Sequence, residues 1–282
     1  MPKKRVLKKK VVTKKKKRSV LDSIEPLGTG LESGIKMALY GRTGTGKTTL
    51  WATFPKPILA IICSGIIRSG EVRSILTPQN KKDIKQHRYT TKDRLISLLE
   101  DLKVNNPFAT IVLDHATSLQ DRILQEILGL EELPAQGSWG MASREQWGQC
   151  SLQTKEVLRS LLNLTGNTIV VAQEREFNTE AENDIIMPYV GAALTPSVTG
   201  WLNQTCDYIC QTYHAAKTKE KIVKIGKKNI KQNIKLEGVE FRLRTAPHEV
   251  FQTRFRMPVS QSSKIPDFIV DPTYSKIEEW IC

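Results

Sequence analysis

The sequence predicts an α/β protein built around a mostly parallel β-sheet, and three observations carry this prediction. Several short apolar runs show no alternation with polar residues, which is typical of strands buried on both faces of a parallel sheet. Segments with helical spacing of apolar residues lie between these runs, so that strands alternate with helices. A glycine-rich motif joins the first run to the first helix. Together they indicate right-handed strand–helix–strand crossovers.

The expected elements follow one another in a regular order. The runs expected to form strands of the parallel sheet are residues 35–41, 56–63, 109–114, 167–173 and 206–213. A helix of about two turns should follow the glycine motif and end at Pro55. A second begins at Thr91, a third carries Leu119, Ile123 and Ile127 on one face, and a fourth runs from a capping box at Ser143 to about Leu162. Residues 129–142 are expected to form an irregular loop.

After residue 213 the pattern changes, because apolar residues now alternate with basic ones. Such alternation is typical of antiparallel strands with one exposed face, and we expect two or three of them to extend the sheet. We therefore expect a disordered basic tail (1–20), a core that contains the glycine-rich motif (21–213), a basic antiparallel extension of that core (214–260) and a C-terminal segment (261–282).

The charge is concentrated in two segments. The chain has a net charge of +14, of which residues 1–18 hold +11 and residues 213–256 hold +8, so the rest is mildly acidic. Basic blocks of this kind bind polyanions, most often nucleic acid, although the tail is equally compatible with a solvated arm. The sequence has no apolar run long enough for a membrane helix, no secretory signal and five scattered cysteines, which favours a cytoplasmic protein without membrane contact.

The motif GRTGTGKT satisfies the phosphate-binding pattern GxxxxGK[ST] in full. Its glycines let successive backbone N–H groups surround a phosphate, Lys47 would reach the β- and γ-phosphates, and the Thr48 hydroxyl would bind Mg²⁺. ATP and Mg²⁺ are the cofactors that this chemistry predicts; the alternative is a glycine-rich turn with a solvated lysine. The predicted nucleotide-binding positions are Gly41, Arg42, Thr43, Gly44, Thr45, Gly46, Lys47, Thr48 and Thr49.

Two further polar residues end buried strands. Asp114 follows an apolar run, where it would hold Mg²⁺ through water, or would instead cap the next helix. Gln173 ends another run and would contact the γ-phosphate, or would merely begin an exposed loop. For His115, a structural hydrogen bond is a better interpretation than a metal or base role.

The glycine motif, an Asp-terminated strand and a strand ending in Gln form a layout that resembles the short RecA-like P-loop ATPases of phages and bacterial genomes, usually labelled AAA-domain or ATP-binding proteins. The resemblance extends over roughly residues 34–258 and includes TTLWATFPKP, REQWGQCSLQTKEVLRSLL and PYVGAALTPSVTGWLNQTCDYI. It implies a RecA-like core, a homo-oligomer and single-stranded DNA as partner. It also implies that Lys47, Thr48, Asp114 and Gln173 have the roles given above, and that residues 174–200 occupy the place of a DNA-binding loop.

The sequence departs from that family at two places. The catalytic glutamate expected after the second strand is replaced by Cys63 and Ser64, and Glu71 is the nearest carboxylate that could act on water. The expected DNA loop also begins with acidic residues, which bind phosphates poorly. Two functions therefore stay open: a Mg²⁺-dependent ATPase acting on single-stranded DNA in recombination or replication, and a nucleotide-dependent DNA-binding or annealing switch with little hydrolysis. A small-molecule kinase is less favoured, because only Arg68 and Arg73 are available for a lid.

Overall fold

The computed structural model describes residues 34–64, 70–130, 142–180, 186–225, 228–257 and 265–281. The chain divides into two units, residues 1–32 and 33–282, and every described residue belongs to the second. The predicted tail at 1–20 and most of the loop predicted at 129–142 therefore lie outside the described residues.

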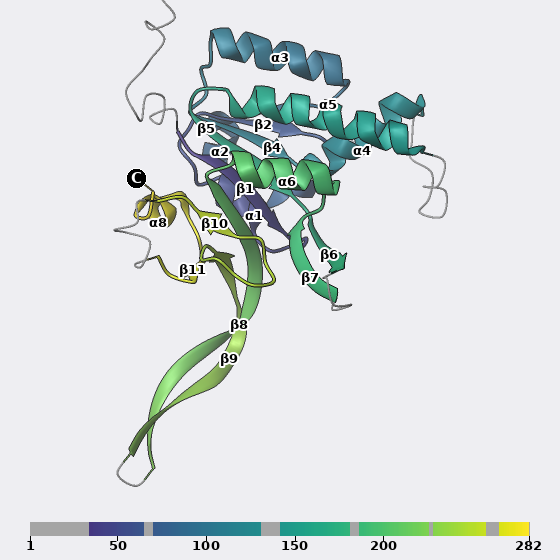
Figure 1. Ribbon diagram of the computed structural model, residues 1–282. Coiled ribbons are helices and arrows are strands. Elements are labelled where there is room, and N and C mark those ends of the chain that lie inside the picture. Colours follow the sequence, from purple (N-terminus) through teal and green to yellow (C-terminus); the bar gives the residue numbers. More distant parts are fainter. Residues whose placement is uncertain are drawn as a thin grey trace, which may run out of the picture. The chain divides into compact units, whose positions relative to one another are not determined.

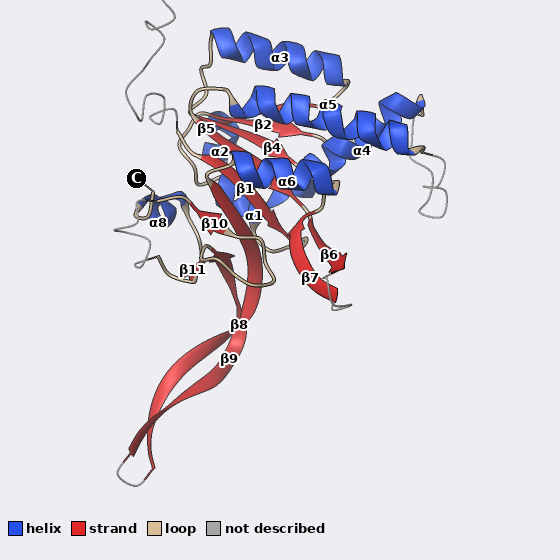
Figure 2. Ribbon diagram, viewed as in Figure 1, coloured by secondary structure: helices blue, strands red, loops and turns tan. Residues whose placement is uncertain are grey.

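Nine of the described strands form one sheet in the order β11-β9-β8-β1-β5-β4-β2-β3, with β10 paired to β8 (Figures 1 and 2). The pairs from β8 through β1, β5, β4 and β2 to β3 are all parallel, whereas β9, β10 and β11 pair antiparallel. The predicted fold class is thus confirmed: a mostly parallel α/β sheet extended by antiparallel strands. The strands are β1 (Lys36–Gly41), β2 (Ile58–Ile62), β3 (Ile84–Arg88), β4 (Thr110–Asp114), β5 (Asn167–Ala172), β8 (Tyr208–Ile225), β9 (Lys228–Arg244), β10 (Arg254–Phe255) and β11 (Phe268–Val270).

Helices cover both faces of the sheet. On one face, α3 (Lys92–Val104), α4 (Ala116–Leu128), α5 (Arg144–Leu162) and α6 (Pro196–Thr205) pack against a common hydrophobic core. On the other, a second core receives α1 (Lys47–Trp51), the 3₁₀ helix η3 (Gly70–Ile75) and α8 (Tyr274–Glu278). The short helix α2 (Pro78–Asp83) leads into β3. None of the described helices is long and apolar enough to cross a membrane.

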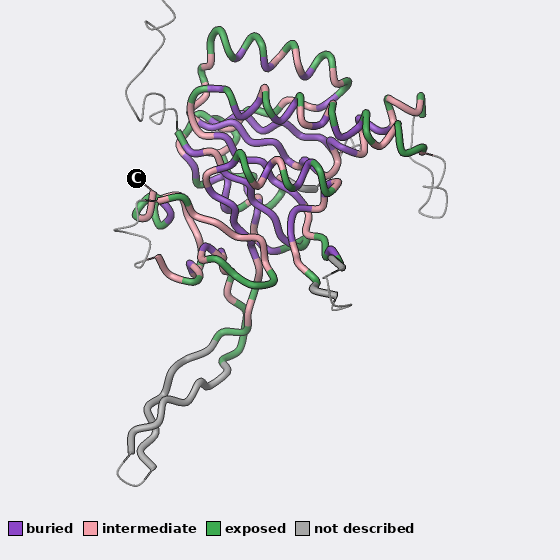
Figure 3. The backbone as a smooth tube through the Cα atoms, in the orientation of Figure 1, coloured by how far each residue is buried: buried purple, intermediate pink, exposed green. Residues whose placement is uncertain are grey.

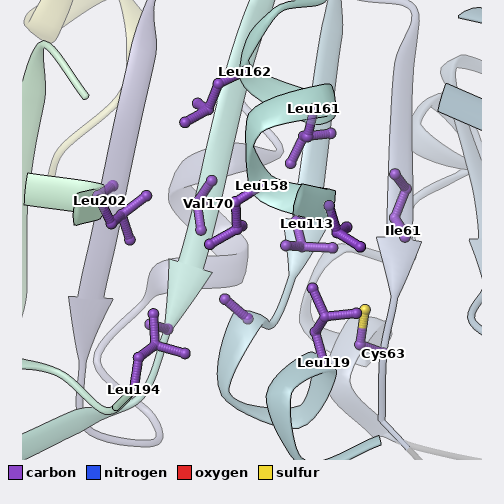
Figure 4. Close-up of a cluster of buried hydrophobic side chains, with 14 of the residues drawn as sticks. Ile61, Cys63, Leu113, Leu119, Leu158, Leu161, Leu162, Val170, Leu194 and Leu202 are labelled. Atoms are coloured by element: carbon purple, nitrogen blue, oxygen red, sulfur yellow. The ribbon is translucent and has the colours of Figure 1, made fainter. Parts of the chain in front are cut away.

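Successive residues of each central strand enter opposite cores. In β4, Ile111 and Leu113 pack beneath α3–α6 while Val112 packs toward α1, and all three are fully buried. Figure 3 shows the central strands buried along their length, and Figure 4 shows Leu113 and Val170 of the sheet beside Leu158 and Leu161 of α5. Burial of both faces is the reason that these strands are continuous apolar runs in the sequence.

Most of the predicted helices are confirmed. The capping box at the start of α5 is complete, because the Gln146 N–H donates to Ser143 Oγ (3.2 Å) and the Ser143 N–H donates to Gln146 Oε1 (2.7 Å). Thr91 caps α3 with a single bond, in which its hydroxyl accepts the Arg94 N–H. Helix α1 has five residues, Lys47–Trp51, and is shorter than the two turns expected. The four described cysteines are buried and form no disulfide.

Two regions differ from the expectation. Strand β3, with the sequence IKQHR, was not predicted; it lies at the sheet edge and pairs with β2 alone, so it lacks the apolar run of a central strand. Residues 174–200, expected to form a loop, contain the antiparallel hairpin of β6 (Glu174–Glu180) and β7 (Ile186–Ala192), followed by the start of α6. Strand β6 is largely polar and β7 largely apolar, and the rings of Phe177 and Tyr189, which are paired across the hairpin, stack with centroids 4.9 Å apart.

Strands β8 and β9 form a long two-stranded ribbon that continues beyond the sheet (Figure 1). Residues Tyr208–Thr212 of β8 pair parallel with β1, and the strand then continues in antiparallel pairing with β9. The domain boundary proposed at residue 213 therefore falls inside β8, just after its contact with the central sheet.

Candidate functional site

The glycine motif forms the turn between β1 and α1, and its glycines are required by geometry. Gly44 and Gly46 have φ of 83° and 88°, in the left-handed region that side chains disfavour. A Cβ on Gly41 would lie 2.4 Å from both the carbonyl oxygen and the hydroxyl of Thr212 on β8. The hydroxyls of Thr45 and Thr212 are themselves hydrogen-bonded at 2.7 Å. The motif is thus held tightly against the neighbouring strand.

A cavity of about 480 Å³ lies over this turn, at the carboxyl ends of the parallel strands. The structure brings Lys47, Thr48, Asp114 and Gln173 together around it, although the sequence separates them by up to 126 residues. Of the other predicted nucleotide-binding residues, Gly41, Arg42 and Thr45 do not line it; the Thr45 hydroxyl donates to the Arg42 carbonyl oxygen inside the turn. The full lining consists of Thr43, Gly44, Gly46, Lys47, Thr48, Thr49, Ser74, Asp114, His115, Gln173 and Phe241.

Lys47 is a buried cation beside this cavity. Its Nζ donates to the carbonyl oxygens of Gly41 (2.6 Å) and Arg42 (2.7 Å). Burial lowers the pKa of Lys47 to about 8, against the opposing effects of Asp114 and Glu174. A desolvated ammonium among backbone dipoles interacts strongly with an incoming anion, because little water is left to screen it.

Asp114 is the last residue of β4 and is buried. The indole Nε1 of Trp51, in α1, donates to its Oδ2 at 3.3 Å, so Trp51 orients the carboxylate besides packing in the core. The helix-cap alternative for Asp114 is wrong, because the cap of α4 is His115, whose Nδ1 accepts the Ser118 N–H at 3.1 Å. His115 thus has the structural hydrogen bond that the sequence favoured.

Gln173 follows β5, which lies between the strands that carry the glycine motif and Asp114. Its backbone N–H donates to Thr117 Oγ1 at 3.1 Å, and its side-chain Oε1 accepts a long hydrogen bond of 3.5 Å from Thr43 in the glycine motif. The amide therefore lies at the cavity and is only weakly held there.

Glu174 has contacts that no pattern in the sequence indicated. Placed in a presumed DNA loop, it instead accepts the Arg42 Nε of the glycine motif at 2.9 Å and the Gln211 Nε2 of β8 at 2.9 Å. Gln211 in turn accepts the Arg244 Nε of β9 at 3.1 Å. A hydrogen-bonded chain therefore links the motif to the base of the ribbon.

The acid proposed to act on water is Glu71 in η3. Glu71 is the second residue of η3, and its side chain lies outside what the structure describes. Ser74, three residues later in the same element, lines the cavity. Cys63, just after β2, is fully buried in the core beneath α4 and α5.

The donor set suits Mg²⁺. Among the described residues, no cluster of three or more His, Cys, Asp or Glu side chains is arranged to hold a metal alone. Mg²⁺ is usually held by one or two protein oxygens together with substrate phosphates and water. The Thr48 hydroxyl and the Asp114 carboxylate, which line one cavity, fit that requirement.

A comparison with known families agrees with this geometry. The family model described as the AAA domain matches residues 33–257, which include every strand of the sheet except β11 and all of the cavity lining. Domains of this family bind nucleotides and are generally ATPases, so nucleotide binding is assigned to the chain at that level. No curated protein matches the sequence.

Proposed function

The chain belongs to the AAA domain family, and from this premise we propose that it is a Mg²⁺-dependent ATPase of the RecA-like type that acts on single-stranded DNA in recombination or replication. The observation that carries the proposal is the meeting of Lys47, Thr48, Asp114 and Gln173 around one cavity above the glycine motif. A homo-oligomeric state belongs to the same proposal and follows from the resemblance, and a cytoplasmic location is proposed from the scattered cysteines.

In this proposal each residue of the cavity has a separate role in phosphoryl transfer. Backbone N–H groups of the motif bind the phosphates, and the Lys47 ammonium exchanges its two carbonyl partners for phosphate oxygens. Thr48 and Asp114 would hold Mg²⁺, which neutralises charge on the β- and γ-phosphates when bound. Gln173 exchanges its weak contact with Thr43 for a hydrogen bond to the terminal phosphate.

Hydrolysis then requires a water in line with the bond to be broken. Water oxygen bonds to the γ-phosphorus as the bond to the ADP oxygen breaks, and the water proton must be accepted. Glu71 is the proposed acceptor because η3, the element in which it lies, also supplies Ser74 to the cavity.

The ribbon supports the choice of DNA as partner. Residues 213–256 carry a net charge of +8, and this stretch includes most of β8 and all of β9. Because β8 pairs with β1 and Gln211 contacts Glu174, a ligand on the ribbon would lie on an element joined to the glycine motif. A polyanion binding there is held mainly by phosphate contacts.

The test is phosphate release from Mg²⁺–ATP by the full chain, with and without single-stranded DNA. Lys47→Ala is the blank, and Lys103→Ala, on the exposed side of α3, is the matched control for loss of one lysine. We expect DNA to raise turnover in the native chain and in Lys103→Ala, and no turnover in Lys47→Ala. Absence of nucleotide binding in the native chain would refute the proposal.

A second function is favoured by one observation. Cys63 and Ser64 directly follow β2, where an acid was expected to activate water, and Cys63 is fully buried. The chain would then be a nucleotide-dependent DNA-binding or annealing switch. Tight, Lys47-dependent nucleotide binding without phosphate release would select this alternative.

A further inference from the structure

The aromatic side chain of Phe241 is partly exposed to solvent, although a phenyl ring is usually buried. Its exposed fraction is 39%, and it is the one aromatic ring among the large apolar residues that the structure describes as exposed. Leaving a phenyl ring partly in water forfeits a good part of the stabilisation that its burial would give. The ring also lines the cavity over the glycine motif.

The fold fixes where this ring lies. Residues two apart on a strand share a face, and Leu243, two residues after Phe241 on β9, is fully buried in the core that contains α1. Phe241 therefore lies on the same face, one step closer to the glycine motif. Its backbone is anchored, since the Asp271 N–H donates to its carbonyl oxygen at 2.7 Å. A Cβ built on Gly46 would lie 3.4–4.0 Å from three atoms of the ring.

The ring is on the opposite side of the motif from the catalytic polar groups. Asp114 and Gln173 follow β4 and β5 on one side of β1, whereas Phe241 belongs to β9 on the other side, beyond β8. In the proposed function the terminal phosphate lies toward Asp114 and Gln173. The α-phosphate and the nucleoside must then extend toward Phe241, because the phosphate chain is roughly linear and passes over Lys47.

We propose that Phe241 stacks on the base of the bound nucleoside triphosphate and forms the base-side wall of the site. This inference rests on the proposed nucleotide function and adds to it a binding residue and a mode of recognition. Stacking on a phenyl ring is tolerant of base identity, because every base presents a π-face. Phe241 therefore contributes affinity for the nucleoside portion and does not discriminate ATP from GTP.

The test compares Phe241→Ala with the native full chain by calorimetric titration of Mg²⁺–ATP, Mg²⁺–GTP and inorganic tripolyphosphate. Loss of one base–aromatic stack should lower the affinities for ATP and GTP by the same factor, about tenfold or more, and leave the affinity for tripolyphosphate unchanged. Phe241→Trp should restore nucleotide affinity. The matched control is Val239→Ala, an exposed apolar residue two positions earlier on β9, which should change none of the three affinities.

Three outcomes would overturn the inference. An equal loss for tripolyphosphate would mean that the ring only supports Gly46 in the motif, and unchanged affinity for all three ligands would mean that it does not touch the nucleotide. A loss of affinity for ATP alone would mean that the site recognises adenine specifically, which stacking on a phenyl ring does not do. These three outcomes leave the proposed function intact, because the native chain still binds tripolyphosphate in each of them. A native chain that binds neither ATP nor tripolyphosphate would refute the proposed function itself.

Discussion

The two halves of the sheet differ in strand direction, strand length and burial. The parallel half, β3-β2-β4-β5-β1, has strands of five or six residues that are mostly buried on both faces, and their carboxyl ends carry the glycine motif, Asp114 and Gln173. The antiparallel half contains strands as long as the 18 residues of β8, which leave the sheet as a ribbon. In the proposed function, the first half positions the groups for phosphate chemistry, and the second supplies a contact to the nucleoside and positive charge for DNA.

Strand β8 belongs to both halves. It pairs parallel with β1 and antiparallel with β9, and Thr212 at this junction bonds to Thr45 of the glycine motif. A change in the motif therefore has a short physical route to the base of the ribbon. If the two halves have these separate roles, substitutions in the parallel half should abolish phosphate release. Substitutions in the antiparallel half should change the stimulation by DNA or the affinity for nucleotide.

The largest effect should come from Asp114→Asn. Asparagine keeps an oxygen that can accept the Trp51 N–H, yet loses the charge that would hold Mg²⁺. Removing one well-placed electrostatic group from a reaction site typically lowers turnover by about 10²–10³-fold, and we expect a loss of that order in phosphate release. Asp121→Asn is the matched control, a carboxyl on α4 outside the cavity whose pKa burial raises to about 6. Turnover close to native in Asp114→Asn would remove Asp114 from the site.

The second largest effect should come from shortening the β8–β9 ribbon. Thr218 and Lys235 face each other in the β8–β9 pairing, so residues 219–234 can be replaced by Asn-Gly, the preferred two-residue hairpin turn. The deleted stretch carries six lysines and one glutamate. We expect DNA stimulation of phosphate release to disappear and the salt dependence of DNA binding to weaken, with nucleotide affinity unchanged. Stimulation that survives the deletion would place the DNA elsewhere.

The third prediction concerns pH and Lys47. The pKa of Lys47 in the nucleotide-free chain is lowered to about 8, and a bound triphosphate favours the ammonium, so the pKa rises on binding. Above pH 8 binding must then take up a proton, and nucleotide affinity should fall by about tenfold per pH unit until the pKa of the bound state is reached. Titrations between pH 7 and 9.5 would show the decline. Lys47→Arg, whose guanidinium stays charged, should bind with a flat profile, and a flat native profile would contradict the prediction.

The parallel half was largely predictable from sequence, for a physical reason. Burial on both faces leaves a continuous apolar run in strands such as β4, and a capping box such as that of Ser143 and Gln146 is local in sequence. The glycine motif is local as well. These signals require no knowledge of which strands are neighbours.

What escaped prediction depends on strand order or on exposure. Strand β3 pairs on one side only, so it carries no apolar run. The ion pair of Glu174 with Arg42, and the position of Phe241 beside the glycine motif, bring together residues more than 130 positions apart. The first depends on the pairing of β5 with β1, and the second on the place of β9 one strand beyond β8. The alternation in EFRLRT predicted a strand with one exposed face, but not what either face contacts.

The smallest effect should come from Glu174→Gln, at the point where the two halves are linked. The Arg42 side chain is 81% exposed, and ion pairs with an exposed member contribute roughly 0–1 kcal/mol, so nucleotide affinity should change by no more than about fivefold. Glutamine still offers an acceptor to Gln211, which preserves the geometry while the charge is lost. Glu176→Gln, exposed two residues further along β6, controls for removal of one negative charge. A reduced DNA response in Glu174→Gln, with near-native nucleotide affinity and no change in Glu176→Gln, would identify this contact as the link between the halves. Complete loss of nucleotide binding would instead make the antiparallel half part of the phosphate site.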